Sequence, residues 1–165
     1  MATEVNATST AAAASSFESN LLPMPAGHVL WDNSQVKPNE VAVYTPKGKP
    51  KTAWLPVVSS VNSTLTVGST GNAISGTNFN GWDLGGAYGY NAQAATNFPA
   101  VRITNTKSGD VCFARSYNFS TMGVWTQGTT NATFDIPSGC ETGTGTLQVI
   151  VNGIASKGMP VTLDS

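Results

Sequence analysis

The sequence predicts an all-β protein built as a sandwich of two packed sheets. Gly occurs 17 times and Pro nine times in 165 residues, and only 10% of the residues are charged. Short apolar runs recur between these turn-forming residues, and almost no stretch has helical periodicity. The 40% hydrophobic content suffices for the core of one domain, with extra segments, rather than for two large domains.

The clearest strand signal is a hairpin within residues 98–126, where large apolar residues alternate with other residues in two successive runs. A period of two places one row of side chains inside and one outside. The second run puts Cys112 on the row expected to face outward. Residues 105–110 supply the Asn, Gly and Asp of a tight turn. Because a half-buried hairpin needs a second sheet to cover it, the rest of the chain should provide that cover.

Further strands are expected over 56–61, 64–67, 72–77, 122–126, 132–136, 146–151 and 159–163. Turns fall at Gly128, at 137–139 and at Asn152-Gly153. This spacing gives eight or nine short strands over residues 54–165, a sandwich of immunoglobulin-like size. Alternation predicts a buried core that contains Val101, Ile103, Val111, Phe113, Phe134, Ile136, Leu147, Val149 and Val151.

The N-terminal third of the chain has a different character. Residues 1–19 are small and polar and predict a flexible arm. Residues 20–46 hold two short apolar runs, which predict a strand pair too small to be stable alone, so it must pair with the main sheets or with another chain. Residues 47–53 contain the string KGKPK and are interpreted as a solvated linker rather than a binding patch.

Charge and targeting signals exclude some classes of partner. Nine acidic against eight basic residues give a net charge of -1, which does not favour nucleic acid. No stretch is long and apolar enough for a signal peptide or a membrane span. The abundant Thr, Ser and Asn suit an extracellular or cell-surface protein. Glycosylation sequons stand at Asn6, Asn62, Asn118 and Asn131, although several could arise by chance in this composition.

Metal, cofactor and catalytic signals are weak. Cys112 and Cys140 allow one disulfide, and two unpaired thiols are the alternative. The single histidine, His28, cannot build a zinc site with them, and a Ser-His-Asp triad lacks a nucleophile elbow. The carboxylates that lie near predicted turns are interpreted as turn-forming groups, and they are Asp83, Asp110, Asp135 and Glu141. We therefore expect no cofactor and no enzymatic activity.

Residues 80–97 form the longest stretch without a strand pattern, and loops of this length often bind or pack on something. Their aromatic and amide side chains could form a sugar-binding platform, which would consist of Trp82, Tyr88, Tyr90, Asn91 and Gln93. The alternative is that the rings cap one end of the sandwich core.

Several unusual strings resemble a known family. The run PVVSSVNSTLTVGSTGNAISGTNF resembles the opening of early-set immunoglobulin-like domains. The strings YTPKGKPKTAWLPVVSSV, GGAYGYNAQAATNFPAVRITN, FARSYNFSTMGV and IPSGCETGTGTLQVIVNGIAS resemble the C-terminal domain of bacterial kelch-repeat proteins related to galactose oxidase. This resemblance covers residues 41–163. LLPMPAGHVLWDN is similar to the strand pair of a final propeller blade in that family.

In the copper oxidases of that wider family, a histidine on a hairpin of this domain ligates copper. The corresponding region here is 115–119, where Tyr117 and Phe119 stand at the positions at which relatives have histidines. The other ligands belong to a propeller that this sequence does not contain. The resemblance therefore does not imply oxidase chemistry.

The leading interpretation is a non-catalytic immunoglobulin-like β-sandwich with a structural, assembly or adhesion role. Its partner would be another protein chain, or a second copy, paired through the strand pair at 20–46. A carbohydrate-binding module that uses the aromatic loop 82–93 is the alternative, with glycans as ligand. A remnant of a copper radical oxidase is a third interpretation.

Overall fold

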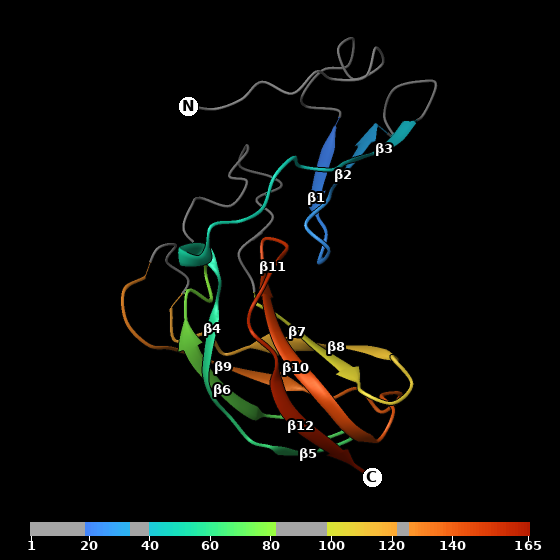
Figure 1. The fold of residues 1–165 in the computed structure, drawn as a ribbon, viewed down its shortest axis with the longest axis vertical. Helices are drawn as coiled ribbons and strands as arrows, with labels where there is room; N and C mark the ends of the chain where they lie inside the picture. The colour runs from blue at the N-terminus through green and yellow to red at the C-terminus, as the bar shows by residue number, and fades with distance from the viewer. Residues whose placement is uncertain (1–18, 34–39, 82–98, 122–125) are drawn as a thin grey trace.

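The structure, a computed structural model, describes residues 19–33, 40–81, 99–121 and 126–165 of the chain. Apart from one 3-10 turn, η2 (Thr52–Trp54), every regular element in this part is a β-strand. The strands form a small sheet at the N-terminal end and a sandwich below it (Figure 1). The predicted all-β sandwich is confirmed.

The small sheet, called the N-terminal sheet below, consists of β1 (Asn20–Pro23), β2 (Val29–Asn33) and β3 (Glu40–Tyr44). The sandwich consists of β4 (Val57–Val61), β5 (Thr64–Thr66), β6 (Asn72–Thr77), β7 (Ala100–Asn105), β8 (Val111–Tyr117), β9 (Thr130–Asp135), β10 (Gly143–Val151), β11 (Ile154–Ala155) and β12 (Met159–Asp164). Strands β1 and β11 were not predicted. Most of the strand expected at 122–126 lies outside the described residues.

The strand order of the sandwich is that of an immunoglobulin domain. One sheet has the order β4-β6-β9-β8, and β8 continues into the second sheet, β8-β7-β10-β12-β5, with β11 on β10. All of these pairings are antiparallel except β12 with β5. The two sheets correspond to the ABED and CFG sheets of the immunoglobulin sandwich.

Seven of the nine predicted core side chains are buried, each at most 3% exposed, and they are Val101, Ile103, Phe134, Ile136, Leu147, Val149 and Val151. They come from both sheets and form one cluster with Phe79, Leu65 and Val161. Strand β10 shows why the prediction succeeds, because Leu147, Val149 and Val151 occupy alternate positions and this row lies between the two sheets.

The prediction is wrong for Val111 and Phe113, which are each 47% exposed. Residues directly opposite each other in an antiparallel pair point to the same face. Ile103 is buried and lies opposite Cys112, whereas Phe113 lies opposite the outward-facing Arg102. Cys112 therefore packs against the core, and its expected place on the outward row is also wrong.

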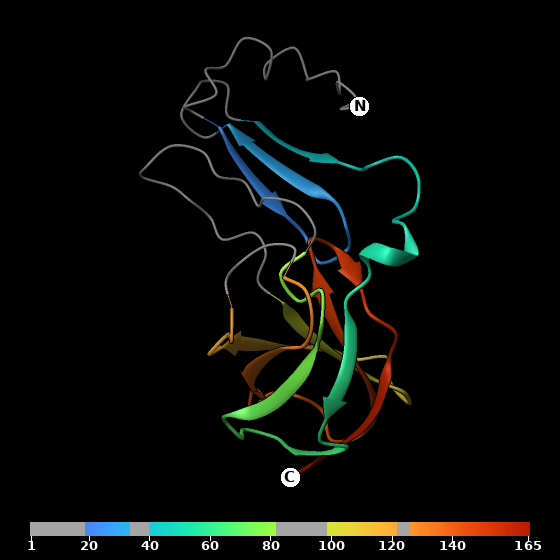
Figure 2. The ribbon, with the colours of Figure 1, turned by 90° about the vertical axis from the view of Figure 1, so that its left-hand side faces the viewer.

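The Asn152-Gly153 turn joins β10 to β11 and supports the N-terminal sheet. Its residues have φ of 49° and 76°, which Asn and Gly adopt more readily than other residues in a two-residue hairpin turn. A Cβ on Gly153 would overlap the backbone of Gly27, in the turn between β1 and β2. The N-terminal sheet thus touches the sandwich where two glycine-containing turns meet (Figure 2).

Candidate functional site

The candidate ligand-binding residues of the aromatic loop lie outside the described residues, and they are Trp82, Tyr88, Tyr90, Asn91 and Gln93. Asp83 lies outside them as well. The sugar-binding platform stays a prediction.

The two cysteines are joined to each other. Cys112 on β8 and Cys140, in the turn after β9, form a disulfide with a Cα–Cα distance of 5.6 Å. The bridge connects positions 28 residues apart, and Cys140 is 7% exposed. Of the two alternatives left open by the sequence, the structure contains the disulfide.

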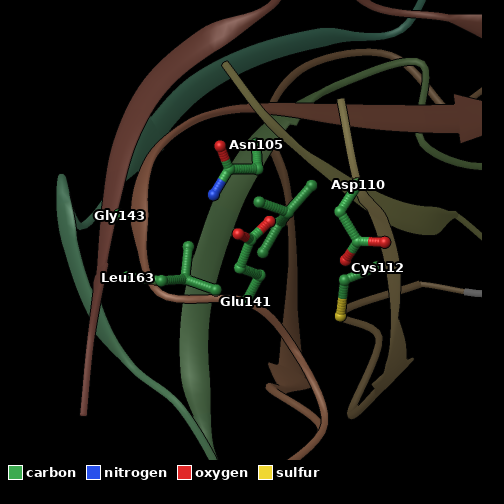
Figure 3. A pocket seen from close by; sticks show the side chains of 7 residues that line it. Asn105, Asp110, Cys112, Glu141, Gly143 and Leu163 are labelled. Atoms are coloured by element: carbon green, nitrogen blue, oxygen red, sulfur yellow. The ribbon is translucent and has the colours of Figure 1, made fainter. Parts of the chain in front are cut away.

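A small hollow lies beside this disulfide (Figure 3). It is lined by Ile103, Asn105, Asp110, Cys112, Glu141, Gly143 and Leu163. Its volume of about 10 Å³ has room for about one water molecule. The Ser108 hydroxyl donates to Glu141 and accepts the backbone N–H of Asp110, so Ser108 links the β7–β8 turn to the Glu141 carboxylate. The hollow is too small for an organic substrate.

The two residues at the positions that the resemblance associates with copper make other contacts. The Tyr117 hydroxyl donates to Asp135 Oδ1 at 2.7 Å, and Phe119 packs against the core cluster. In the described ranges, no group of three or more His, Cys, Asp or Glu side chains could hold a metal ion. His28 Nδ1 lies 3.0 Å from the Thr45 hydroxyl.

Tyr117 and Asp135 shift each other's pKa. The hydrogen bond from Tyr117 is the main cause that lowers the pKa of Asp135, and the N–H of Gly71, 2.9 Å from the same oxygen, adds to it. The same hydrogen bond raises the pKa of Tyr117 above its ordinary value of 10.0. Both pKa shifts favour a protonated Tyr117 and an ionised Asp135. In this state the hydrogen bonds connect β8, β9 and the turn at Gly71. The pair is therefore interpreted as a structural link.

The N-terminal sheet has apolar side chains on both faces. Cross-strand register places Leu22, Leu30 and Val43 in one row on the first face, with Val41 beside them. The side chains from the two edge strands of this face are exposed: Leu22 is 58% exposed, Val41 66% and Val43 54%.

The second face carries the row Leu21, Trp31 and Ala42, in which Leu21 is 64% exposed. The buried core cluster contains no residue from either face of the N-terminal sheet. Soluble proteins that expose contiguous apolar side chains in this way commonly use them to bind another protein. Sequence reasoning found β2 and β3 here but missed β1, whose four residues carry too little periodicity to be recognised.

The edges of the sheets differ in how they are protected against pairing. In the sandwich, the register of the edge strand β4 shifts between Val58 and Ser60, and the other edge strand, β5, has only three residues. Edge strand β1 contains Pro23, which lacks an N–H. Strand β3 has no proline, no basic residue and no register shift. It is the least protected edge in the described part of the chain.

Three of the sequon residues, Asn62, Asn118 and Asn131, are exposed. Asn6 lies outside the described residues. No helix within the described ranges has the length and apolar character to cross a bilayer.

Comparison with known proteins gives no family assignment, because no protein-family model and no curated protein matches the sequence. Among the sites described, only the N-terminal sheet exposes apolar side chains on both faces without packing them against the core of the sandwich.

Proposed function

We propose that the protein is a non-catalytic β-sandwich module that assembles with another protein chain through its N-terminal sheet. The observation that carries this proposal is the uneven distribution of exposed apolar side chains. Among the described residues, nine large hydrophobic side chains are exposed, and five of them belong to the N-terminal sheet: Leu21, Leu22, Val41, Val43 and Tyr44. The described strands of the sandwich, which are more numerous, have only three, Val57, Val111 and Phe113, and the ninth, Trp54, lies in η2.

Burial of these side chains provides the driving force. Full burial of a Val or Leu side chain is worth about 1.5–3 kcal/mol, so covering the exposed half of each should contribute roughly 1 kcal/mol. A partner that covered four of them would therefore gain several kcal/mol before the cost of association. Three strands are the minimum for an independently stable sheet, so a partner that covered its apolar face would also stabilise the sheet itself.

The chemistry of the sandwich favours an extracellular or cell-surface location for this module. Disulfides persist in oxidising compartments and are rare in the cytosol, which makes the Cys112–Cys140 bridge an argument for export. The exposed sequons Asn62, Asn118 and Asn131 would be accessible to glycosylation there. The immunoglobulin strand order also supports descent from the early-set domain of kelch-repeat proteins, as the resemblance implies.

Light scattering on the full chain over a range of concentrations tests the proposal. We expect the mass to rise with concentration above 17.0 kDa. Val43→Asp should abolish this rise, because it places a charge within the apolar row of the N-terminal sheet. Val57→Asp is the matched control, since Val57 on β4 is 51% exposed and Val43 is 54% exposed.

Both variants should keep the Cys112–Cys140 bridge and the wild-type unfolding transition, which shows that the sandwich is intact. A chain that stays monomeric at every concentration, or that responds equally to both substitutions, would refute assembly through the N-terminal sheet.

A further inference from the structure

Strand β3 forms one edge of the N-terminal sheet, and no described strand pairs with its outer side (Figure 1). Proline, a register shift, very short length and charged residues, lysine above all, protect edge strands against pairing. Strand β3 has no proline, no register shift and no lysine, and its one charged side chain is Glu40, at its first position. By contrast, β1 contains a proline, β4 has a register shift and β5 has only three residues. An edge of this kind is a template for another strand.

The sequence of β3 suggests which strand that is. Residues 40–44 read Glu-Val-Ala-Val-Tyr, so valines stand symmetrically on either side of Ala42. We propose that β3 pairs antiparallel with β3 of a second copy, about a two-fold axis at Ala42. This inference rests on the proposed function and specifies its partner as the same chain.

Two-fold pairing centred on Ala42 satisfies both strands over their whole length. Val41 of each copy lies opposite Val43 of the other, and Ala42 lies opposite Ala42. A register centred on any other residue leaves part of the five-residue strand unpaired, and a slip by one residue moves every side chain to the wrong face. A symmetric interface of this type is self-complementary and closes at two subunits.

The pairing also continues the apolar rows of each copy across the junction. On one face, Leu21, Trp31 and Ala42 of one copy meet the same row of the second copy, end to end. On the other face, the row of Leu22, Leu30 and Val43 meets Val41 of the second copy. Two three-stranded sheets, each with only the minimum number of strands for independent stability, thereby become one six-stranded sheet.

A cysteine cross-link tests the register. In an antiparallel pair, opposite residues have Cα atoms about 4.5–5.5 Å apart, which suits a disulfide. Ala42→Cys in the full chain should therefore form an intermolecular disulfide under mild oxidation. The product should run at twice the chain's 17.0 kDa on a non-reducing gel.

Val41→Cys is the matched control, because residue 41 is adjacent and 66% exposed but would face its own counterpart only diagonally. Diagonal neighbours lie about 7–8 Å apart, beyond the reach of an unstrained disulfide. Cross-linking of the Ala42→Cys protein, with little or none of the Val41→Cys protein, is the expected result.

The outcomes separate this inference from the proposed function. Equal cross-linking at both positions, in a chain that still associates through its N-terminal sheet, would overturn the two-fold pairing and leave the assembly role standing. A monomeric chain without preferential cross-linking at residue 42 would overturn both.

Discussion

Phe134 and Phe113 lie on the neighbouring strands β9 and β8 in opposite environments, at 0% and 47% exposure. Truncation of Phe134 removes a ring from a packed core and leaves a cavity, so Phe134→Ala should cost about 3–5 kcal/mol in unfolding free energy. Phe113→Ala should stay within about 1 kcal/mol of wild type, because its ring is half in water. Urea unfolding of both variants measures this difference. Similar losses of unfolding free energy would show that Phe113 on β8 points into the core.

This pair of residues also shows how far the sequence could predict the core. Alternation gives the period of a strand but not which row faces inward. On β10 the phase is clear, because Gln148 separates Leu147 from Val149. On β8 both rows are apolar, and the pairing of Cys112 with Ile103 decides the phase instead. That partner depends on the length of the β7–β8 turn and on the bridge to Cys140, neither of which alternation contains.

Removal of the Tyr117 hydroxyl should make stability respond differently to pH. The lowered pKa of Asp135 means that its hydrogen bonds stabilise the fold above the ordinary value of 3.8 and lose this effect as pH falls through the lower folded pKa. The raised pKa of Tyr117 affects stability at the other end of the pH range. Its protonated hydroxyl stabilises the fold below the ordinary pKa of 10.0, and this stabilisation is lost as pH rises through the higher folded pKa. Tyr117→Phe should therefore be less stable than wild type at neutral pH and converge with it in acid.

Urea midpoints measured from neutral pH to below pH 3.8 check this expectation. Tyr44→Phe, which removes a hydroxyl from the N-terminal sheet, provides the comparison and should show no such convergence. A deficit of Tyr117→Phe that is the same at every pH would contradict the coupling.

At the scale of elements, the contact between the β1–β2 and β10–β11 turns should determine how firmly the N-terminal sheet is held. Gly153→Ala should destabilise the protein in two ways. Alanine is strained at the φ of 76°, and its Cβ would overlap the backbone of Gly27. Gly128→Ala isolates the first effect, because Gly128 has φ of 87° and nothing within 4 Å of an added Cβ. We expect Gly153→Ala to be the more destabilising and to speed amide exchange at Met24 and Gly27. Equal effects would show that the turns do not support each other.

The same contact shows what sequence reasoning could recognise in this region. The Asn-Gly dipeptide predicts a hairpin turn locally, and that prediction is confirmed by the pairing of Val151 with Ile154. The meeting of Gly153 with Gly27 joins positions more than a hundred residues apart, and no local pattern indicates it. Strand β1 of the N-terminal sheet was missed for a related reason, since it is defined by its pairing with β2 rather than by its own composition.

At the scale of the whole molecule, two modes of assembly differ in what they require of the sandwich. If the partner covers only a face of the N-terminal sheet, the two sandwiches can adopt many relative positions. Pairing through β3 instead places the sandwiches at opposite ends of a continuous six-stranded sheet, related by a two-fold axis. The sandwich edges β4 and β5 then stay free of the interface, in agreement with the register shift and short length that protect them.

Complementary charges provide a test of this geometry in the complete assembly. In the two-fold pair, residue 41 of each copy lies opposite residue 43 of the other, so Val41→Lys/Val43→Lys sets like charges against each other twice. The Val41→Glu/Val43→Glu protein suffers the same repulsion, and each should be monomeric by light scattering. Mixed in equal amounts, the two proteins should form a one-to-one dimer, because every cross-strand pair then joins Lys to Glu. The mixed dimer should weaken as salt is raised, since the pairs are exposed to solvent. If the mixture stays monomeric at low salt while the wild-type chain dimerises, residues 41 and 43 do not face each other across the interface.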